Sequence, residues 1–352
     1  MDFEVIGQAV ENAKIKVVGV GGGGGNAVIH MINHNIEGVD FICANTDTQA
    51  LSTADGAITL KLGNGLTKGL GAGADPDIGR RAAESDRNAI EELLTGADMI
   101  FITAGMGGGT GTGAAPVIAS IAKEIGALTV AVVTKPFRFE GKKRMGAAEK
   151  GLAALVEEVD SLVTIPNQKL YEILGEDTPM QDAFAKADDV LRGAVQGISD
   201  IIMKKGHINV DFADVKTVMS EKGTAMMGTG ISSGPDRARI AAEQAVASKL
   251  LEDISLKDAK GVLVNITAGP ELSLGEIKAV GDCINSFASS EAIIVTGTVL
   301  DESSTNDLTV TVIATGLNSS VQTASNKIQG VRVVNERQPL PLSDAAKQLL
   351  DN

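Results

Sequence analysis

Glycines and threonines crowd the segment Gly107–Gly113 (GGGTGTG), the stretch of this sequence best suited to bind a phosphate. It follows the apolar run Met99–Ala104 and precedes the helix-compatible run Ala114–Ala119, so it connects a predicted buried strand to a predicted helix. Because glycine has no Cβ, its backbone N–H groups can turn toward an anion, and the start of a helix adds unpaired N–H groups and a positive dipole end. Thr110 and Thr112 add hydroxyl donors. The segment therefore predicts a phosphate cradle.

A second glycine run follows the apolar run Ile15–Val20. Taken alone, Gly19, Gly21 and Gly24 fit the dinucleotide fingerprint G-x-G-x-x-G, and Asp47 follows at about the expected 20 residues. A nicotinamide-dependent oxidoreductase is therefore one hypothesis, and a tight strand-to-helix turn without a ligand is another. Against the oxidoreductase, one pyrophosphate does not require a second glycine cradle, and no proton donor stands out. A Walker-type kinase or ATPase is disfavoured because the sequence holds no G-x-x-x-x-G-K-[ST].

A third loop, Gly71–Ala74, precedes a helix that Asp75 and Pro76 are well suited to open. If the two glycine runs and this loop meet at one edge of a sheet, they surround several phosphates rather than one. The expected ligand is then a nucleoside triphosphate.

Two carboxylates three residues apart, Asp211 and Asp214, lie in the segment Asn209–Asp214. At the start of a helix they can share one face and orient an attacking water. The same residues also cap free N–H groups and complement the helix dipole, and the sequence does not separate the two roles. The histidines His30, His34 and His207 are expected to be surface or core residues.

Composition narrows the function further. The chain of 352 residues carries 31 basic and 45 acidic side chains, a net charge of −14, with Phe 8, Tyr 1 and Trp 0. The negative charge and the scarcity of rings disfavour nucleic acid as a partner. No apolar run approaches the roughly 18 residues of a membrane span, so no direct membrane insertion is expected. Cys43 and Cys283 lie in separate apolar runs, which predicts buried, reduced thiols in a cytoplasmic protein.

Strands alternate with helices in the first half of the chain, which predicts an α/β fold with a parallel sheet and function at the carboxyl ends of its strands. The strands are expected at Ile15–Val20, Val39–Ala44, Met99–Ala104, Leu128–Thr134 and Asp160–Pro166, with a hairpin-like region after the second. Apolar residues spaced by three and four predict one long helix over about 179–205. The predicted domains are an arm (1–13), a nucleotide domain (14–178), a central helix (179–206), a smaller α+β domain (207–317) and a flexible tail (318–352).

Five motifs together carry a resemblance to a known family: GGGGGN at 21–26, NTD at 45–47, GAGA at 71–74, GGGTGTG at 107–113 and NVDFAD at 209–214. In this order they resemble the tubulin/FtsZ family of GTPases, over about residues 13–317. The resemblance implies a Rossmann-like parallel-sheet GTPase domain, a long central helix and a smaller α+β C-terminal domain. It also implies a cytoplasmic protein that polymerises head to tail, hydrolyses GTP to GDP and phosphate, and forms the ring at the bacterial division site.

The resemblance assigns a set of nucleotide-binding residues from the loops, the central helix and the segment around 140. They are Gly22, Gly23, Asn26, Asn45, Asp47, Ala72, Gly73, Ala74, Gly105, Gly108, Gly109, Thr110, Gly111, Thr112, Glu140, Arg144, Asn167, Phe184 and Asp188. In this assignment Asn26 and Asp188 read the base while Phe184 stacks on it. An ionised carboxylate accepts both the ring N–H and the exocyclic amine of guanine, a donor pair that adenine lacks, so Asp188 favours GTP. Plainer alternatives are a solvated carboxylate at Asp188 and a surface ion pair between Glu140 and Arg144.

By the same resemblance, Asn209, Asp211 and Asp214 enter the nucleotide site of the next subunit and complete catalysis there. Mg²⁺ is expected on the phosphates, since no cluster of metal ligands is visible, and K⁺ is a further candidate cation. Cell-division anchor and regulator proteins are implied partners. The family's apolar and basic C-terminal peptide is not recognisable in Ser343–Asn352, which weakens the expectation that anchors bind the tail, and Asp75 stands where members commonly have Asn. Two alternatives stay open: the NAD-dependent oxidoreductase, and a GTP-binding structural polymer with little turnover.

Overall fold

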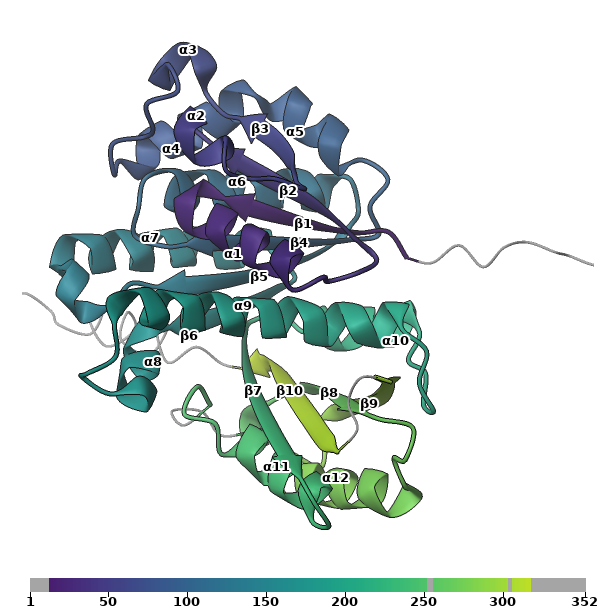
Figure 1. Cartoon of the computed structure of the whole chain (residues 1–352). Coiled ribbons are helices and arrows are strands. Elements are labelled where there is room, and N and C mark those ends of the chain that lie inside the picture. The colour runs from purple at the N-terminus through teal and green to yellow at the C-terminus, as the bar shows by residue number, and fades with distance from the viewer. Residues whose placement is uncertain (1–12, 252–255, 303–305, 318–352) are drawn as a thin grey trace, which may run out of the picture. The chain divides into compact units, whose positions relative to one another are not determined.

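A single ten-stranded sheet runs through the part of the chain that the structure, a computed structural model, describes: residues 13–251, 256–302 and 306–317 (Figure 1). Its strand order is β3-β2-β1-β4-β5-β6-β7-β10-β8-β9. The strands are β1 Ile15–Val20, β2 Val39–Asn45, β3 Ile58–Lys61, β4 Met99–Gly105, β5 Leu128–Lys135, β6 Ser161–Pro166, β7 Thr224–Ser233, β8 Gly261–Ala268, β9 Ile293–Leu300 and β10 Asp307–Leu317.

The first six strands are parallel and have the order of a doubly wound nucleotide-binding sheet. From β1 the chain passes outward to β2 and β3 and then crosses to β4 on the other side of β1. The topological switch point therefore lies between β1 and β4, which pair in register from Ile15 with Met99 to Val20 with Ala104. Beyond β6, strand β7 is parallel to it, and β10 is antiparallel to both of its neighbours, β7 and β8.

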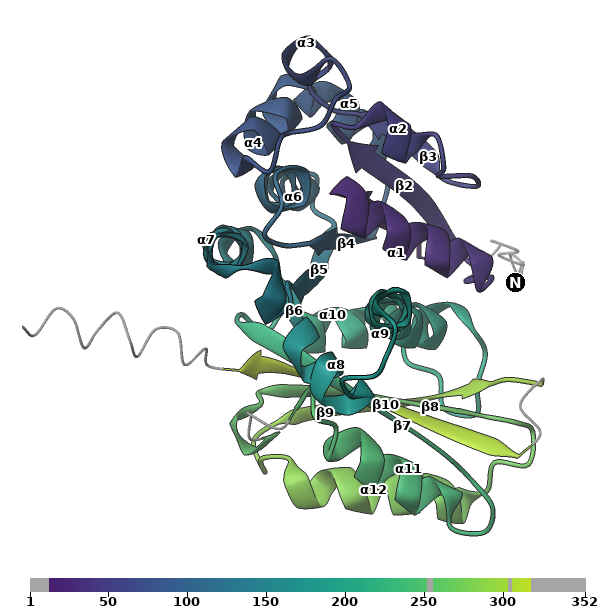
Figure 2. The same ribbon diagram turned by 60° about the vertical axis from the view of Figure 1, so that its left-hand side comes forward.

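Helices bury both faces of the parallel sheet, which is why its strands are continuous apolar runs. Helices α1 and α9 (Met180–Met203) cover one face, and α4, α5, α6 and α7 cover the other (Figure 2). Alternate residues of β1 pack on the two sides: Val17 into the core with α1 and α9, and Val18 into the core with the other four helices. The helices of this half are α1 Gly21–Asn33, α2 Thr48–Leu51, α3 Asn64–Thr67, α4 Pro76–Ser85, α5 Arg87–Leu94, α6 Thr110–Glu124, α7 Lys142–Glu158 and α8 Asn167–Leu174.

The helix α9, Met180–Met203, connects the two halves of the sheet. Its buried residues Leu191, Ala194 and Ile198 share one core with β1, β4 and β5 and also with Met227 and Leu263 of the C-terminal strands. A separate core lies under α11 and α12. The remaining helices are α10 Phe212–Met219, α11 Arg237–Val246 and α12 Leu274–Phe287. Across the described ranges, no helix combines the length and apolar character needed to cross a membrane.

Three sequence-based expectations were wrong in detail. The region after β2 is not a hairpin: it holds α2 and then β3, which pairs parallel to β2. Helix α6 begins at Thr110, so the second half of the glycine segment is its first turn rather than a loop before it. Cys43 is buried as expected, and burial raises the pKa of its thiol to about 11, but Cys283 is only half-buried. The predicted tail, 318–352, and nearly all of the arm, 1–13, lie outside the described residues.

Candidate nucleotide site

The two glycine runs lie against each other at the switch point of the sheet. A Cβ built on Gly21, whose φ is +71°, would lie 2.8 Å from the backbone nitrogen of Gly111. A Cβ on Gly23 would lie 3.2 Å from the Cα of Gly105. The turns after β1 and β4 therefore pack backbone to backbone, and side chains at these positions would separate them.

The loop before α4 joins them. A Cβ on Gly109 would lie 2.8 Å from the Cβ of Ala72 and 2.9 Å from the backbone nitrogen of Asp75. Within the loop, Gly73 and Ala74 have φ values of +59° and +58°, and an alanine in this region costs energy that its surroundings must offset. The structure thus brings together the three loops that the sequence predicted to converge.

Two helices begin at this convergence without a side-chain cap. The N-cap residues Val20 of α1 and Gly109 of α6 make no side-chain hydrogen bond to the first turn. Their free N–H groups and positive dipole ends are available to an anion. Among the described residues, no heavy atom outside the local backbone would lie within 4 Å of a Cβ on Gly22 or Gly108, so the approach to the backbone is open there. These features fit a phosphate chain.

A fourth segment borders the cradle at Gly107, whose φ is +99° and whose Cβ would lie 2.7 Å from the carbonyl oxygen of Arg144. The Gly107 N–H donates to Thr112 Oγ1 at 2.8 Å. Arg144 Nη1 lies 3.1 Å from Glu140 Oε2, while the other oxygen of Glu140 accepts from the backbone N–H of Phe137 at 2.8 Å. The ion pair considered as the plainer alternative is present, and it places a half-exposed guanidinium beside the cradle.

The NTD segment at the end of β2 contributes a contact that the sequence did not predict. The buried hydroxyl of Thr46 lies 2.7 Å from that of Thr110 and so connects the end of β2 to the first turn of α6. Asn45 is buried and lines a small cavity of about 50 Å³ next to Gly21 and Gly22. The Asp47 carboxylate instead accepts from the backbone N–H of Gln49 at 2.9 Å and caps α2.

A larger cavity of about 430 Å³ lies between α1 and α9. Its lining includes the three residues expected to read or stack on a base, and in full comprises Asn26, Ile29, His30, Asn33, Gln181, Phe184, Ala185 and Asp188. Burial raises the pKa of Asp188 to about 6, a shift that the nearby His30 opposes and Asp189 reinforces. Phe184 is 41% exposed, and its ring lies nearly perpendicular to that of Phe137 with the centroids 5.4 Å apart.

Asn167, the first residue of α8, is 4% exposed, and its side-chain oxygen has no hydrogen-bond partner among the described residues. A buried acceptor left without a donor in the protein is available to a donor on a bound molecule. Its position at the carboxyl end of β6, two strands along from β4, agrees with the predicted role beside a nucleotide.

The predicted catalytic residues lie elsewhere. Asp211 caps α10 by accepting from the Asp214 N–H at 2.8 Å, and Asn209 accepts from the Gly206 N–H at 3.0 Å. All three are exposed at the C-terminal end of α9, whereas Phe184 lies near its N-terminus (Figure 1). A helix of 24 residues is about 36 Å long, so one chain does not bring these carboxylates to its own cradle.

Known proteins are similar to this chain in sequence and fold. The family described as "Tubulin/FtsZ family, GTPase domain" matches residues 14–175, and "FtsZ family, C-terminal domain" matches residues 223–318. The cell division protein FtsZ of Pseudomonas aeruginosa is 62% identical over 332 residues, covering 93% of this chain and 84% of that protein. The protein of that name from Coxiella burnetii is 61% identical over 317 residues, covering 90% of this chain and 82% of its own.

Solved structures agree with the sequence matches. An empty FtsZ dimer from M. jannaschii superposes with a TM-score of 0.84 at 43% identity, covering 95% of this chain and 96% of that chain. A GTPγS-bound protofilament of CetZ2 from Haloferax volcanii has a TM-score of 0.74 at 21% identity, over 90% of this chain and 97% of its own. At that identity the second likeness concerns the fold alone.

Proposed function

The chain belongs to the tubulin/FtsZ family, and from this premise we propose that it binds GTP in the cradle described above and hydrolyses it at the junction between two subunits. It is a tubulin-like GTPase that forms polymers. The proposal concerns two points: which residues take part in each step of the reaction, and the division of the active site between neighbouring chains.

One observation carries the nucleotide assignment: two uncapped helix N-termini and three close-packed loops meet beside a cavity that holds a carboxylate. The N–H groups of α1 and α6 would hold the phosphates, with Gly22 and Gly108 on the open side. The loop containing Ala72, Gly73 and Ala74 would border the terminal phosphate. This arrangement favours a triphosphate over a dinucleotide because Asp47, the acid of the dinucleotide fingerprint, is used to cap α2.

Guanine recognition would rest on Asp188. Its carboxylate lies in the cavity with Asn26 and Phe184, where it can accept two N–H groups from guanine while Phe184 stacks on the ring. Adenine presents one exocyclic donor and an acceptor at the same edge, so the carboxylate would be left partly unpaired. Asn167 and Arg144 would contact the sugar or the phosphates.

Hydrolysis would be completed by the next subunit in the filament. The cradle supplies donors for the charge that develops during phosphoryl transfer. Two carboxylates border it among the described residues, Asp47 and Asp75, and each caps a helix. Asp211 and Asp214 are exposed at the other end of α9, as a head-to-tail contact requires. The loop before them is held firmly, because Ile208 and Thr298 exchange hydrogen bonds through the Ile208 N–H at 2.7 Å and the Ile208 carbonyl at 3.0 Å. We propose that Asp214 orients the water and Asn209 and Asp211 shape the contact.

Cations would reduce the charge of the triphosphate. The described residues hold no group of three metal-ligating side chains at the cradle, so Mg²⁺ would be bound by phosphate oxygens and water, with K⁺ as a further candidate. When bound, such a cation offsets negative charge on the phosphates during transfer. The site of action we propose is the cytoplasmic division ring, with anchor and regulator proteins of division as further partners.

Sedimentation and phosphate release, measured with GTP, GDP, ATP and NADH over a range of protein concentrations, test this function. We expect polymer with GTP and a specific activity that rises steeply above a threshold concentration. A specific activity independent of concentration would refute hydrolysis between subunits. Polymer with GTP but without phosphate release would support the structural polymer instead, and spectral or activity changes with NADH would support the oxidoreductase.

A further inference from the structure

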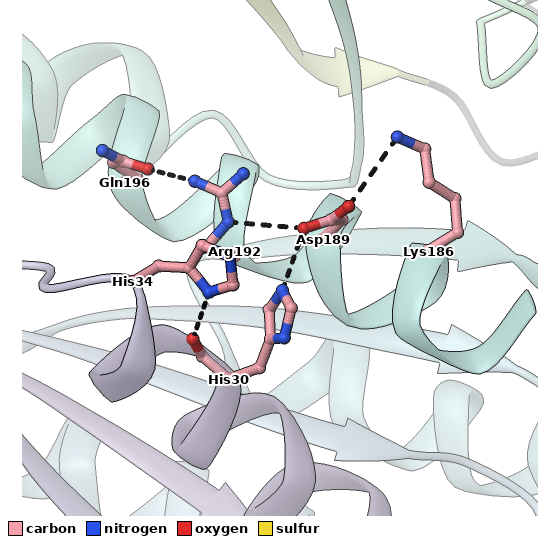
Figure 3. A network of polar contacts seen from close by, with 6 residues as sticks. All are labelled: His30, His34, Lys186, Asp189, Arg192 and Gln196. Carbon is pink, nitrogen blue, oxygen red and sulfur yellow. Dashed lines mark hydrogen bonds and ion pairs between the residues drawn. The ribbon is translucent and has the colours of Figure 1, made fainter. Parts of the chain in front are cut away.

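Two histidines and an aspartate that have no part in the proposed reaction come together where the last turn of α1 meets α9 (Figure 3). His30 and His34 are one helical turn apart, and Asp189 comes from α9, far away in the sequence. Each offers one ligand atom, and these three atoms lie within 4.8 Å of one another. Within the described residues this is the one group of three metal-ligating side chains.

The hydrogen bonds of the cluster prepare its nitrogen atoms for a metal. His34 Nδ1 lies 2.8 Å from the backbone oxygen of His30, which can only accept, so Nδ1 carries the hydrogen (Figure 3). In the neutral ring Nε2 of His34 then holds a free lone pair, as in histidines whose outer hydrogen bond fixes the metal-binding tautomer. His30 Nε2 forms a hydrogen bond of 2.9 Å with Asp189 Oδ1. A metal ion bound by both atoms would displace the proton of this hydrogen bond.

We propose that His30, His34 and Asp189 form a binding site for a divalent transition metal ion of the zinc class. Two imidazole nitrogens and one carboxylate oxygen suit Zn²⁺ and its neighbours, whereas Mg²⁺ and Ca²⁺ prefer oxygen ligands alone. Three protein ligands leave one tetrahedral position for water. The cluster also lies at the C-terminus of α1, where the helix dipole favours a cation.

The positive charges around Asp189 do not prevent metal binding. Arg192 Nε lies 3.6 Å from Oδ1 and Lys186 Nζ lies 3.8 Å from Oδ2, both longer than a hydrogen bond. Arg192 has a closer partner in Gln196 Oε1 at 2.6 Å, so it can release Asp189 and stay paired.

A metal at this site would connect the two walls of the cavity. His30 lines that cavity together with Asp188, and Asp189 follows Asp188 directly on α9. Coordination would therefore fix α1 to α9 beside the position proposed for the base. The site itself uses none of the residues assigned to the nucleotide.

Calorimetric titration of the full chain with ZnCl₂ alone, in excess Mg²⁺ and without phosphate buffer, tests the site. We expect one zinc ion per chain, and an affinity at least about tenfold lower in His34→Ala and in Asp189→Asn. The chain contains three histidines, so His207→Ala, exposed and outside the cluster, is a matched control that should bind like the wild type. His34 is exposed, so its replacement should leave the circular dichroism and the melting curve unchanged.

The absorption spectrum of bound Co²⁺ provides a second readout, which reports the type of ligand rather than the affinity. Co²⁺ in place of Zn²⁺ should give the visible absorption of a four- or five-coordinate ion with nitrogen ligands in the wild type and in His207→Ala, and a weakened spectrum in His34→Ala. No zinc binding in excess Mg²⁺ would overturn the proposal. Equal binding by the wild type and His34→Ala, or loss of binding in His207→Ala, would overturn it as well.

Discussion

Asp211 accepts a hydrogen bond from the backbone N–H of Asp214 at 2.8 Å, so the two carboxylates of α10 have different surroundings. The Asp211 side chain is the N-cap of the helix, whereas the Asp214 side chain is exposed in its first turn. Asp214→Ala should therefore still bind GTP and sediment as polymer, with phosphate release lowered by about 10²-fold or more. Loss of nucleotide binding in this variant would refute the assigned role.

Asp211→Ala tests the capping role of the other carboxylate. Losing the N-cap should lower the free energy of unfolding by about 1 kcal/mol, in addition to any effect on turnover. Asp211→Asn keeps a capping oxygen and should recover most of that stability. Urea unfolding of the three chains, followed by circular dichroism, checks the order; equal stability of Asp211→Ala and the wild type would show that the cap contributes nothing.

Mixing two inactive variants should restore activity if the site is shared between chains. Asp188→Ala lacks the proposed base contact but keeps Asp214, and Asp214→Ala keeps an intact cradle. In a mixed filament the cradle of one meets α10 of the other, as a heterologous head-to-tail interface allows. We expect the mixture to release phosphate faster than either variant alone, whereas a rate equal to the average of the two would place the complete active site within one chain.

The sequence predicted most of the cradle because the two glycine runs follow uninterrupted apolar strands. The last apolar residues of those strands, Val20 and Ala104, fix the edge of the sheet at which the glycine runs lie. Periodicity likewise located α9. Other features had no local signal. Strand β3 has four residues without a buried position, so nothing in its pattern separated it from a hairpin. The contact between Thr46 and Thr110 depends on strands β2 and β1 and helix α6 being assembled, and therefore appears only in the folded chain.

Asp188 should make nucleotide affinity depend on pH. Its pKa of about 6 in the protein means that acidification protonates the carboxylate that guanine requires, so GDP affinity should fall about tenfold between pH 7 and pH 5. Titrations of mant-GDP at several pH values check this. In Asp188→Asn the affinity should be lower and should change less over that range; His30, which lines the same cavity, is unchanged in both chains.

The same raised pKa predicts an opposite trend for the stability of the nucleotide-free chain. A carboxyl whose pKa is higher in the folded than in the unfolded state contributes stability that is complete below the unfolded value, 3.8, and is lost as the pH rises through about 6. Relative to Asp188→Asn, the wild type should therefore lose stability from pH 5 to pH 7. A difference between the two chains that does not change with pH would contradict the burial of this carboxyl.

Gly22 allows the cradle to be tested without disturbing its packing. In the part of the chain that the structure describes, no atom outside the local helix backbone lies within 4 Å of a Cβ at Gly22 or at Gly146, and both lie in helices. Each Ala variant should differ from the wild type by no more than about 1 kcal/mol in unfolding free energy. Only Gly22→Ala should lower GTP affinity, by at least tenfold or about 1.4 kcal/mol, since its methyl group would occupy the approach of the phosphates. Equal affinities in the two variants would place the phosphates elsewhere.

The last prediction concerns the carboxylate of Asp75, which lies beside the loop proposed for the terminal phosphate. Its Oδ1 accepts from the Asp77 N–H at 3.0 Å and caps α4, so the charge faces the helix dipole rather than the ligand. Asp75→Asn, which preserves a capping oxygen, should leave GTP affinity within about twofold, whereas Asp75→Ala should lower the unfolding free energy by about 1 kcal/mol. A clear gain in GTP affinity in Asp75→Asn would instead show that the carboxylate repels the phosphate, and that its capping bond is not maintained when nucleotide binds.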